Sequence, residues 1–373
     1  MQVKVTKLRE VMKLLEPAVP KKTALPILHN VLLKDGKAIA GDMEAFVLVD
    51  LPEADIECLI PHKSVMQLLK YVPGNEILTI EVNKELTFIS ESGKSSFPRV
   101  KAKDYPVIRE IVAKAQGTMD GNTLITALAS AAEYCATDEG RPVLNGVTIF
   151  PGENLDIAAG DGFRMAYQTI PCSFPIEQPL IIPSGAVSLL STLWQHTRPD
   201  VALGGSLVGL VTQKRQIDVT FAEGDKVSPD KLQLRFGGVT VQIVLIKGTP
   251  PNFKQLIPKE TPTRVQLFPG DLERAVRRLS VIAKDDKGIV RLSWTNDLMT
   301  VSASNEEAGK IEGTLPVQAD NPGQVAINIS YLLEYLKGKE GLITLGFSGG
   351  TAPVVLRYRG SPLVLVMPMN VQW

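Results

Sequence analysis

Apolar residues recur along the chain at the spacing of an amphipathic helix, and they do so at six places. The first set is Leu8, Val11, Met12 and Leu15, which fall at i, i+3, i+4 and i+7 and so form one apolar stripe along a helix. The other five sets repeat this spacing: Val65, Leu68, Leu69 and Val72; Leu124, Ala127, Leu128 and Ala131; Ala186, Leu189, Leu190 and Leu193; Leu272, Ala275, Val276 and Leu279; Ile329, Leu332, Leu333 and Leu336. Six amphipathic helices are therefore predicted.

Between these helices lie short β-rich runs bounded by Gly, Asn, Asp and Pro. Residues 77–83 (ILTIEVN) and 85–92 (ELTFISES) are an example, and they predict two antiparallel strands joined by a turn. Helices gathered on one side of antiparallel strands give an α+β fold, in which the polar sides of the helices face away from the sheet.

The same pair of runs occurs three times, so the chain is predicted to consist of three versions of one unit. Each pair joins an apolar run to a second run through a turn: 25–34 to 40–52, 141–150 to 159–171, and 287–296 to 303–316. This spacing is that of whole domains and exceeds the roughly 20–50 residues of solenoid repeats. The length of 373 residues accommodates three domains, predicted at 1–112, 113–250 and 251–373.

The composition is that of an ordinary globular protein, with 44% hydrophobic and 21% charged residues. Forty basic residues balance forty acidic ones, so the whole molecule presents no strong field to nucleic acid, and any polyanion must bind locally. No run has the length of a membrane span, and residues 1–17 lack the features of a signal peptide, so we expect a cytoplasmic protein with no membrane partner. Cys58, Cys135 and Cys172 are scattered, which favours reduced core thiols over a disulfide framework or a metal site.

No motif of an enzyme active site is present, and we expect a protein without catalytic activity, metal or cofactor. The phosphate-binding loop, dinucleotide-binding, zinc-protease and serine-hydrolase motifs are all missing. His29, His62 and His196 lie far apart in the sequence, which argues against a metal site or a histidine-centred triad. Asp42 and Asp161 occupy equivalent repeat positions; a carboxylate pair is one interpretation, but recurrence in two domains favours a turn in which Asp bonds the local backbone.

Basic residues flank the polar sides of the predicted helices. They are Lys7, Arg9, Lys13, Lys63, Lys70, Arg274, Arg277, Arg278, Lys284, Lys337 and Lys339. Taken alone, such residues are typical of a solvated helix face, and a role in binding requires that the helices be gathered along one surface.

Over its whole length the sequence resembles one family, the bacterial DNA polymerase III beta subunits, which are the sliding clamps of replication. The resemblance rests on the order and spacing of several motifs: KTALPILHNV, SGKSSFPRVKAKDYP, RPVLNGV followed by GDGFRMA, PPNFKQLIP, LERAVRRLSVIA, INISYLLEYLKG and LVLVMPMNVQW. It implies a head-to-tail homodimer whose six similar domains close a ring, with helices inside and antiparallel sheet outside.

A ring of this kind encircles duplex DNA and tethers its partners for processive synthesis. The implied partners are double-stranded DNA, bound without sequence preference, the replicative polymerase, the clamp loader and other proteins with clamp-binding peptides. Since a ring holds DNA by a topological link, binding is expected to be weak and sensitive to salt, which agrees with the zero net charge. The residues expected to face DNA are Lys22, Arg141, Lys13, Lys70, Arg277, Arg278 and Lys337.

The dimer is expected to join the first unit of one subunit to the third unit of the other. A basic edge in the first unit consists of Lys94, Arg99 and Lys101, and an acidic edge in the third consists of Glu306 and Glu307. Opposite charges would steer this contact.

The resemblance also implies a cleft that takes short linear peptides from partner proteins, between the second and third domains. The matching positions are Leu144, Gly160, Gly162, Phe163, Arg164, Met165, Pro251, Leu256, Tyr331, Val366, Met367, Pro368 and Met369. Leucine, valine and methionine side chains offer an adaptable apolar pocket. The alternative is that VLVMPM is simply the last strand of the third core.

The chain departs from the family pattern at three places. Residues 160–164 read GDGFR where the family usually has Thr-Asp-Gly-His-Arg, so Phe163 replaces a histidine and the threonine hydroxyl is missing. Residues 370–373 continue past the usual end, and Trp373 either caps the cleft or extends freely. The stretch from Asp200 to Pro229 is long and suggests an added hairpin. A second function class, a clamp-fold scaffold that binds proteins without loading onto DNA, stays open beside the clamp.

Overall fold

The structure is a computed structural model, and it divides into two compact units. It describes residues 1–106, 111–138, 140–172, 174, 176–197, 215–224, 230–283, 288–305 and 309–372. Unit 1 comprises Met1–Ala129, Pro151–Asn154 and Cys172–Gly248. Unit 2 comprises Ser130–Phe150, Leu155–Pro171 and Thr249–Trp373.

One order of elements, a strand, a helix, four strands, a second helix and three strands, occurs three times. The first copy is β1 (Gln2–Lys4), α1 (Val5–Leu15), β2 (Asn30–Lys34), β3 (Lys37–Gly41), β4 (Ala45–Asp50), β5 (Cys58–Pro61), α2 (His62–Leu69), β6 (Ile77–Val82), β7 (Glu85–Ser90) and β8 (Gly93–Pro98). The second is β9 (Ala115–Asp120), α3 (Gly121–Ala132), β10 (Gly146–Phe150), β11 (Leu155–Gly160), β12 (Arg164–Ile170), β13 (Leu180–Pro183), α4 (Ser184–His196), β14 (Gln216–Ala222), β15 (Lys231–Phe236) and β16 (Val239–Val244).

The third copy adds one short strand to this order. It is β17 (Thr263–Leu267), α6 (Pro269–Ala283), β18 (Ile289–Trp294), β19 (Leu298–Asn305), β20 (Gly309–Pro316), the added β21 (Gln318–Ala319), β22 (Gly323–Asn328), α7 (Ile329–Leu336), β23 (Ile343–Phe347), β24 (Val354–Arg357) and β25 (Leu363–Val366). Short 3-10 turns are η1 (Glu16–Ala18), η2 (Pro26–His29), η3 (Ala102–Asp104), η4 (Pro142–Leu144) and η5 (Phe253–Leu256).

The apolar stripes predicted from the sequence form the buried faces of all six helices. In α1, the four residues Leu8, Val11, Met12 and Leu15 are buried, and so are Leu124, Ala127, Leu128 and Ala131 in α3. In the other four sets one residue each, namely Leu68, Leu189, Ala275 and Leu333, is only partly buried. The helical period therefore identified the core-facing side of each helix.

Two antiparallel sheets lie in unit 1. One has the order β5-β2-β3-β4-β16-β15-β14-β9 and the other the order β1-β6-β7-β8. The pair β6 and β7, predicted as a hairpin, is confirmed, with Thr79 opposite Ile89 and Val82 opposite Leu86. In the larger sheet β4 of the first copy pairs with β16 of the second, so one sheet contains strands of both copies.

Unit 2 repeats this design with strands of the second and third copies. Its strands follow one another in the order β10-β11-β12-β25-β24-β23-β17-β21, and a separate sheet has the order β20-β19-β18-β22. Strand β12 of the second copy pairs antiparallel with β25 of the third, with Arg164 opposite Val366. Residues 363–366 thus form the last strand of the chain.

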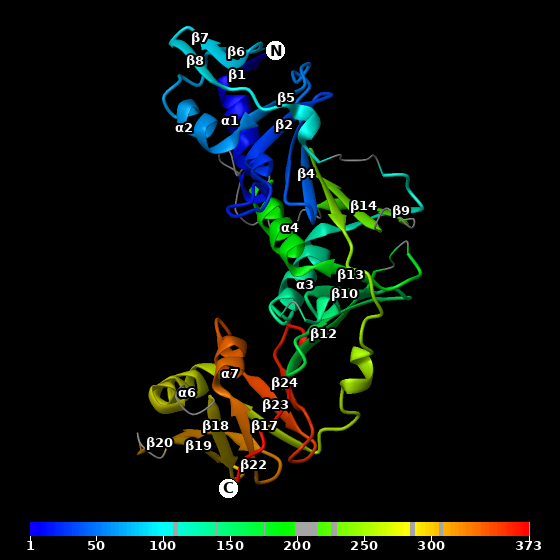
Figure 1. Ribbon diagram of the computed structural model, residues 1–373. Coiled ribbons are helices and arrows are strands. Elements are labelled where there is room, and N and C mark those ends of the chain that lie inside the picture. Colours follow the sequence, from blue (N-terminus) through cyan, green and yellow to red (C-terminus); the bar gives the residue numbers. More distant parts are fainter. Residues whose placement is uncertain are drawn as a thin grey trace, which may run out of the picture. The chain divides into compact units, whose positions relative to one another are not determined.

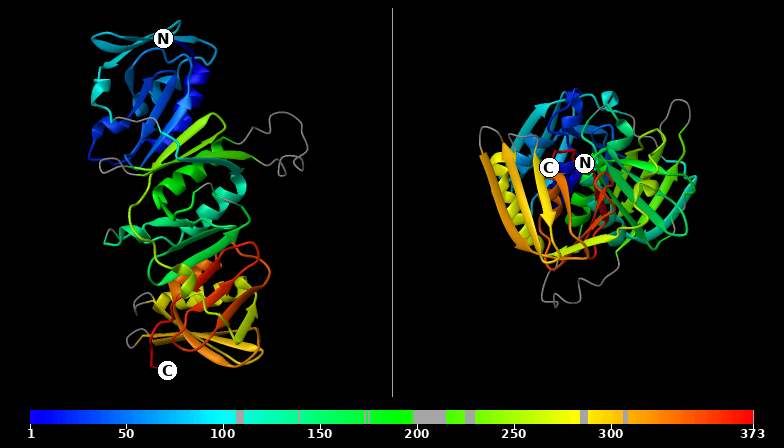
Figure 2. Two further views of the ribbon diagram at one scale, coloured as in Figure 1. Left: turned by 90° about the vertical axis from the view of Figure 1, so that its right-hand side faces the viewer. Right: turned by 90° about the horizontal axis from the view of Figure 1, so that it is seen from below.

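In the part of unit 2 built from the third copy, both helices lie on one face of a sheet. Helix α6 contacts β18, β19, β20 and α7, and α7 contacts β22. Figure 1 shows α6 and α7 on the same side of these strands, and the left view of Figure 2 shows α6 on one side of the sheet. The arrangement is the predicted α+β layer.

The three predicted domain boundaries stay a prediction, since the two compact units each combine elements of two copies. No helix within the described residues is both long and apolar enough to span a membrane.

The buried stripe of α1 leads to a stability prediction. Leu8 is fully buried, so Leu8→Ala leaves a cavity and is expected to lower the free energy of unfolding by about 2–5 kcal/mol. Lys13→Ala, on the exposed side of the same helix, is expected to change it by less than about 0.5 kcal/mol. Urea denaturation measures both; equal effects would show that the stripe does not form the core.

Candidate functional site

The loop between β11 and β12 is a tight turn held by one aspartate. Oδ1 of Asp161 accepts hydrogen bonds from the backbone N–H groups of Phe163 and Arg164, each at 2.9 Å. Between them Gly162 has φ +95°, a conformation that favours glycine, and a Cβ there would lie 2.5 Å from Nη1 of Arg141. The predicted turn role of Asp161 is confirmed, and Arg141 packs against the turn.

The equivalent turn in unit 1 has the same construction. Oδ1 of Asp42 accepts hydrogen bonds from the backbone N–H groups of Glu44 at 3.1 Å and Ala45 at 3.0 Å. Met43 has φ 82° where the second copy has Gly162. The turn interpretation therefore holds for both aspartates, because each bonds its own local backbone.

Arg164 links three elements of unit 2. Its Nε lies 3.0 Å from Oδ2 of Asp161, and its Nη1 pairs with the carboxylate of Glu334 on α7. The guanidinium lies over the ring of Tyr134, 5.2 Å from the centroid, and over that of Tyr331, 4.8 Å from the centroid. Such stacking of Arg on aromatic faces adds to the ion pairs.

Electrostatics keep the Arg164 group charged and the two tyrosines neutral. Burial of Arg164 opposes its charge, but hydrogen bonds and charges from Glu334 and Asp161 place its pKa above the ordinary value. Burial raises the pKa of Tyr134 to about 12, and burial also raises that of Tyr331. The phenol of Tyr331 is therefore a neutral hydrogen-bonding group at physiological pH.

Sequence reasoning identified Arg164 and Tyr331 but missed Tyr134 and Glu334. Glu334 lies three residues after Tyr331 on α7, so the two share a helix face, and this spacing was a usable signal. Tyr134 follows α3, and no local pattern connects it with residues 30 positions later. Long-range contacts of this kind depend on strand pairing.

An apolar cluster lies beside this ion-pair group in unit 2. Its buried members are Ala158, Met165, Tyr167, Phe253, Val355 and Leu365, and Leu144 packs against them. A Cβ at Gly160 would lie 3.1 Å from Cε1 of Phe253, so glycine permits the close approach of η5 to β11. Phe253, absent from the predicted set, is the member that fixes η5 with its flanking Pro251 and Leu256.

The terminal segment that follows β25 is bonded to this region at two points. The backbone N–H of Met367 donates to the carbonyl oxygen of Phe163 at 2.8 Å, and that of Met369 donates to the carbonyl oxygen of Ala326 at 2.8 Å. The side chains of Phe163 and Met367 are 58% and 43% exposed, although both are large and apolar. The bond between their backbones places these two exposed apolar side chains close together on the surface of unit 2.

All thirteen positions of the predicted peptide site lie in unit 2. Met165 and Val366 are buried, Leu144, Arg164, Tyr331, Pro368 and Met369 are partly buried, and Phe163, Leu256 and Met367 are exposed. Val366 is a strand residue facing the core, as in the alternative interpretation of VLVMPM, whereas residues 367–369 continue beyond the strand. The structure therefore gives the buried half of the set a packing role and leaves the exposed half available for binding.

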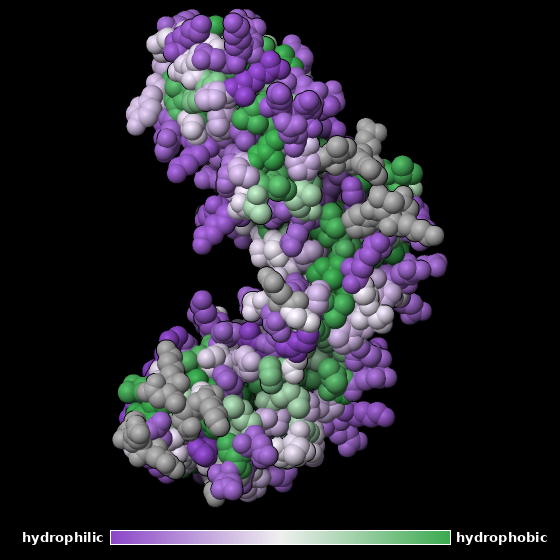
Figure 3. Space-filling view, viewed as in Figure 1, coloured by the Kyte–Doolittle hydropathy of each residue, from purple (hydrophilic) through white to green (hydrophobic). Residues whose placement is uncertain are grey.

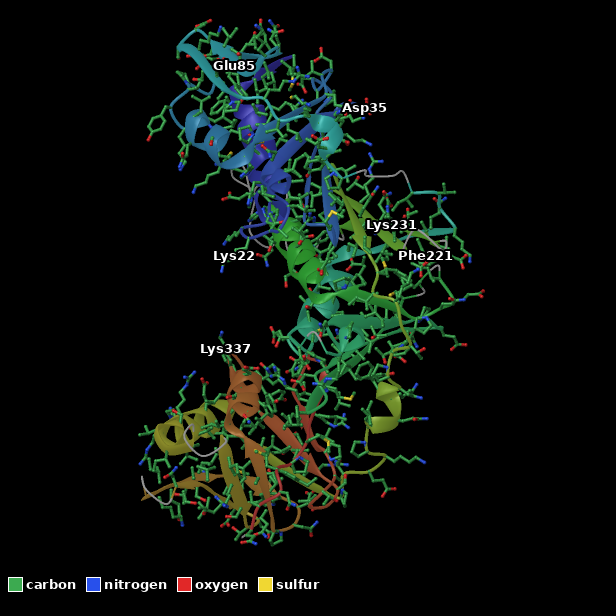
Figure 4. All side chains as sticks on the ribbon, viewed as in Figure 1. Lys22, Asp35, Glu85, Phe221, Lys231 and Lys337 are labelled. Atoms are coloured by element: carbon green, nitrogen blue, oxygen red, sulfur yellow. The ribbon has the colours of Figure 1, made fainter. Side chains whose placement is uncertain are left out.

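The predicted DNA-facing residues of unit 1 are exposed. Lys13, Lys22 and Lys70 are exposed, and none of them forms an ion pair with a described residue. Figure 3 shows hydrophilic side chains interspersed with apolar ones on this face of unit 1, and in Figure 4 Lys22 extends away from its loop. Two other basic residues of α1 serve the fold instead. Lys7 pairs with Glu53 at 2.7 Å, and Arg9 donates to the carbonyl oxygens of Leu69 and Val72.

Unit 2 contains the other predicted DNA-facing residues. Arg278 and Lys337 are exposed, and Lys337 extends outward after α7 in Figure 4. Arg277 bonds Glu273 on its own helix through Nε at 2.9 Å and Nη2 at 2.6 Å, which offsets its charge. Arg141 lies 3.7 Å from Asp138 and is about half exposed.

The predicted interface residues are described only in part. Lys94 is exposed on β8, Arg99 donates to the carbonyl oxygen of Asn83 at 2.9 Å, and Lys101 is exposed. Glu306, Glu307, Lys284 and Trp373 lie outside the described residues, as does most of the stretch from Asp200 to Pro229.

The chain is similar to known proteins in both sequence and fold. Residues 254–370 match the family model described as DNA polymerase III beta subunit, C-terminal domain. A beta sliding clamp from Synechococcus elongatus is 24% identical over 384 residues, covering 97% of this chain and 96% of that protein. One from Staphylococcus epidermidis is 23% identical over 378 residues, covering 95% and 94%.

Solved structures give the same result for the fold. The crystal structure of the DNA polymerase III subunit beta from Pseudomonas aeruginosa aligns with a TM-score of 0.85 at 20% identity over 100% of both chains. The predicted fold, α+β with three repeated domains of the DNA clamp type, is therefore confirmed.

Arg164 is predicted to stabilise the fold around the candidate site. Arg164→Ala removes its charge-assisted hydrogen bonds and both ring contacts, and is expected to lower the free energy of unfolding by about 1.5–3 kcal/mol. Arg274→Ala removes only an exposed pair with Asp271 on the same helix and is expected to change it by less than about 0.5 kcal/mol. Scanning calorimetry compares the two; an Arg164 variant as stable as the Arg274 variant would show that the site does not depend on this residue.

Proposed function

Because the chain has the fold of the DNA polymerase III beta subunits over its whole length and matches their C-terminal domain, we propose that it is a sliding clamp. It encircles duplex DNA and tethers DNA polymerase III and other replication and repair proteins for processive synthesis. The observation that carries this proposal is the repeated pairing of strands between copies, β4 with β16 and β12 with β25, which is how a chain of similar domains extends toward a ring.

The ring is a head-to-tail homodimer. Strand β8 ends one sheet of unit 1 and β20 ends one sheet of unit 2, so each has an unpaired edge among the described strands. Pairing β8 of one subunit with β20 of its partner covers both edges and continues the pattern that already joins the copies within the chain. The basic side chains near β8 suit an acidic edge on the partner.

The clamp holds DNA without reading its sequence. The exposed lysines and arginines on helices and loops meet phosphates, which carry no sequence information, and the neutral net charge suits a ring that slides. It acts in the cytoplasm without catalysing a reaction, and the clamp loader and polymerase reach it as partners.

Partner proteins bind unit 2 through short peptides that engage the exposed apolar side chains of Phe163, Leu256 and Met367, with Met369 and Tyr331 beside them. Arg164 and its two tyrosines fix the polar side of this surface. A clamp-fold scaffold that binds such peptides without loading onto DNA is the competing function, and DNA binding separates the two.

The dimer contact gives the first prediction for this function. Lys94→Glu reverses a charge on β8 and is expected to weaken the dimer, most strongly at low salt, because opposite charges steer the contact. Lys37→Glu makes the same change at an exposed position on β3, in the other sheet of unit 1, and is the control. Sedimentation equilibrium measures the dimer constant. A Lys94→Glu dimer as tight as that of the control would remove β8 from the interface.

The peptide site gives the second prediction. A peptide of the form Gln-x-x-Leu-x-Phe is expected to bind with roughly micromolar affinity, since burial of its Leu and Phe contributes about 1.5–3 kcal/mol each before association costs. Met369→Ala is expected to raise the Kd about threefold to tenfold, and Met43→Ala, in the equivalent turn region of unit 1, is expected to leave it unchanged.

The affinity is also expected to change less than about twofold between pH 5 and pH 8, because Phe163 replaces the titrating imidazole. Fluorescence anisotropy with a labelled peptide measures both effects. Equal binding by the Met369 variant would refute the site, and a strong pH dependence would refute the argument from Phe163.

A further inference from the structure

All three histidines of the chain line one groove in unit 1. The chain contains three histidines, His29, His62 and His196, and each contributes to the lining of a groove of about 1360 Å³. They come from η2, α2 and α4, so the fold brings together residues that are up to 167 positions apart. Separation along the sequence therefore does not keep these three histidines from sharing one surface.

The groove is basic. Its other charged lining residues are four lysines, Lys13 on α1, Lys21 before η2, and Lys63 and Lys70 on α2, set against two glutamates, Glu10 on α1 and Glu16 in η1. The lysines outnumber the glutamates, so the lining carries a positive excess even when every histidine is neutral. A groove of this size exceeds the roughly 300–1000 Å³ typical of small-molecule sites and is open to an extended polyanion.

The three histidines differ in their exposure to the groove. His62 is 7% exposed, and its Nε2 lies 2.9 Å from the carbonyl oxygen of Met12, so it joins α2 to α1. His29, the last residue of η2, and His196, the last residue of α4, are exposed on the groove. Only these two present an imidazole to a ligand.

We infer that this groove holds the phosphate backbone of DNA and that His29 and His196 join Lys13 and Lys70 in contacting phosphates when they are protonated. The inference rests on the proposed function and assigns it a pH dependence. Histidine titrates in the range between pH 5 and pH 8. An imidazolium donates charge-assisted hydrogen bonds to phosphate, so bound DNA favours the protonated form.

By reciprocity, protonation of the two histidines favours bound DNA. The affinity for DNA is therefore expected to fall as the pH rises through this range. The logarithm of the binding constant falls linearly with the logarithm of the salt concentration. Each phosphate that the protein neutralises makes this slope steeper by about 0.9. Each imidazolium that contacts a phosphate is expected to make this slope steeper by up to about 0.9, so the wild-type slope is expected to be steeper at pH 6 than at pH 8.

The test measures binding of a fluorescent duplex oligonucleotide over a salt series at both pH values. The double variant His29→Gln/His196→Gln is expected to show one slope at both pH values, because glutamine is polar but does not titrate. Lys84→Gln, an exposed lysine outside the groove, is expected to keep the wild-type difference. Lys13→Gln/Lys70→Gln is expected to reduce the slope at both pH values, and light scattering confirms that every variant assembles as the wild type does.

Two results would overturn the inference while leaving the clamp function intact. One is a double histidine variant that keeps the wild-type difference in slope, and the other is a Lys13/Lys70 variant that binds as the wild type does. A wild-type protein that binds no duplex at either pH, even at low salt, would also overturn the inference, whereas failure to remain on a closed circle after loading would contradict the proposed function itself.

Discussion

Strand pairing between successive copies of the repeat is the interaction on which the rest of the structure depends. The backbone hydrogen bonds of β4 with β16 and of β12 with β25 turn the outer strands of separate repeats into shared sheets. An unpaired strand edge exposes polar groups that readily pair with other chains, and each pairing removes two such edges. The apolar stripes form the buried faces of the helices, but the strand pairings decide which repeats lie together.

The candidate site follows from the second of these pairings. Because β12 pairs with β25, Arg164 lies opposite Val366, and the loop that begins at Asp161 meets the segment that ends the chain. Arg164 also pairs with Glu334 and lies over the ring of Tyr331, both on α7. These contacts join α7 to the same region. Residues from the second and third repeats therefore form one surface, although the loop at Asp161 and the segment after Val366 lie far apart in the sequence.

The sequence predicted the features that depend on local periodicity. The helix stripes, the β6–β7 hairpin and the turn aspartates were identified because spacing and residue type determine them directly. The family resemblance supplied the members of the peptide site, but neither source indicated Tyr134, Glu334 or Phe253, whose contacts form only after distant strands pair. Basic residues were the least predictable, since Lys7 and Arg9 look like surface charges in the sequence and bond groups of their own unit in the structure.

The central claim is that the protein holds DNA by encircling it and not by tight binding. Retention on closed circular DNA, compared with the same DNA after it is cut once, tests this claim most directly. After loading by the clamp loader onto a nicked circle, the protein is predicted to remain with the circle during gel filtration at physiological salt and to be released when the circle is linearised. Retention that is the same on circular and linear DNA, or no retention on the circle, would contradict the account.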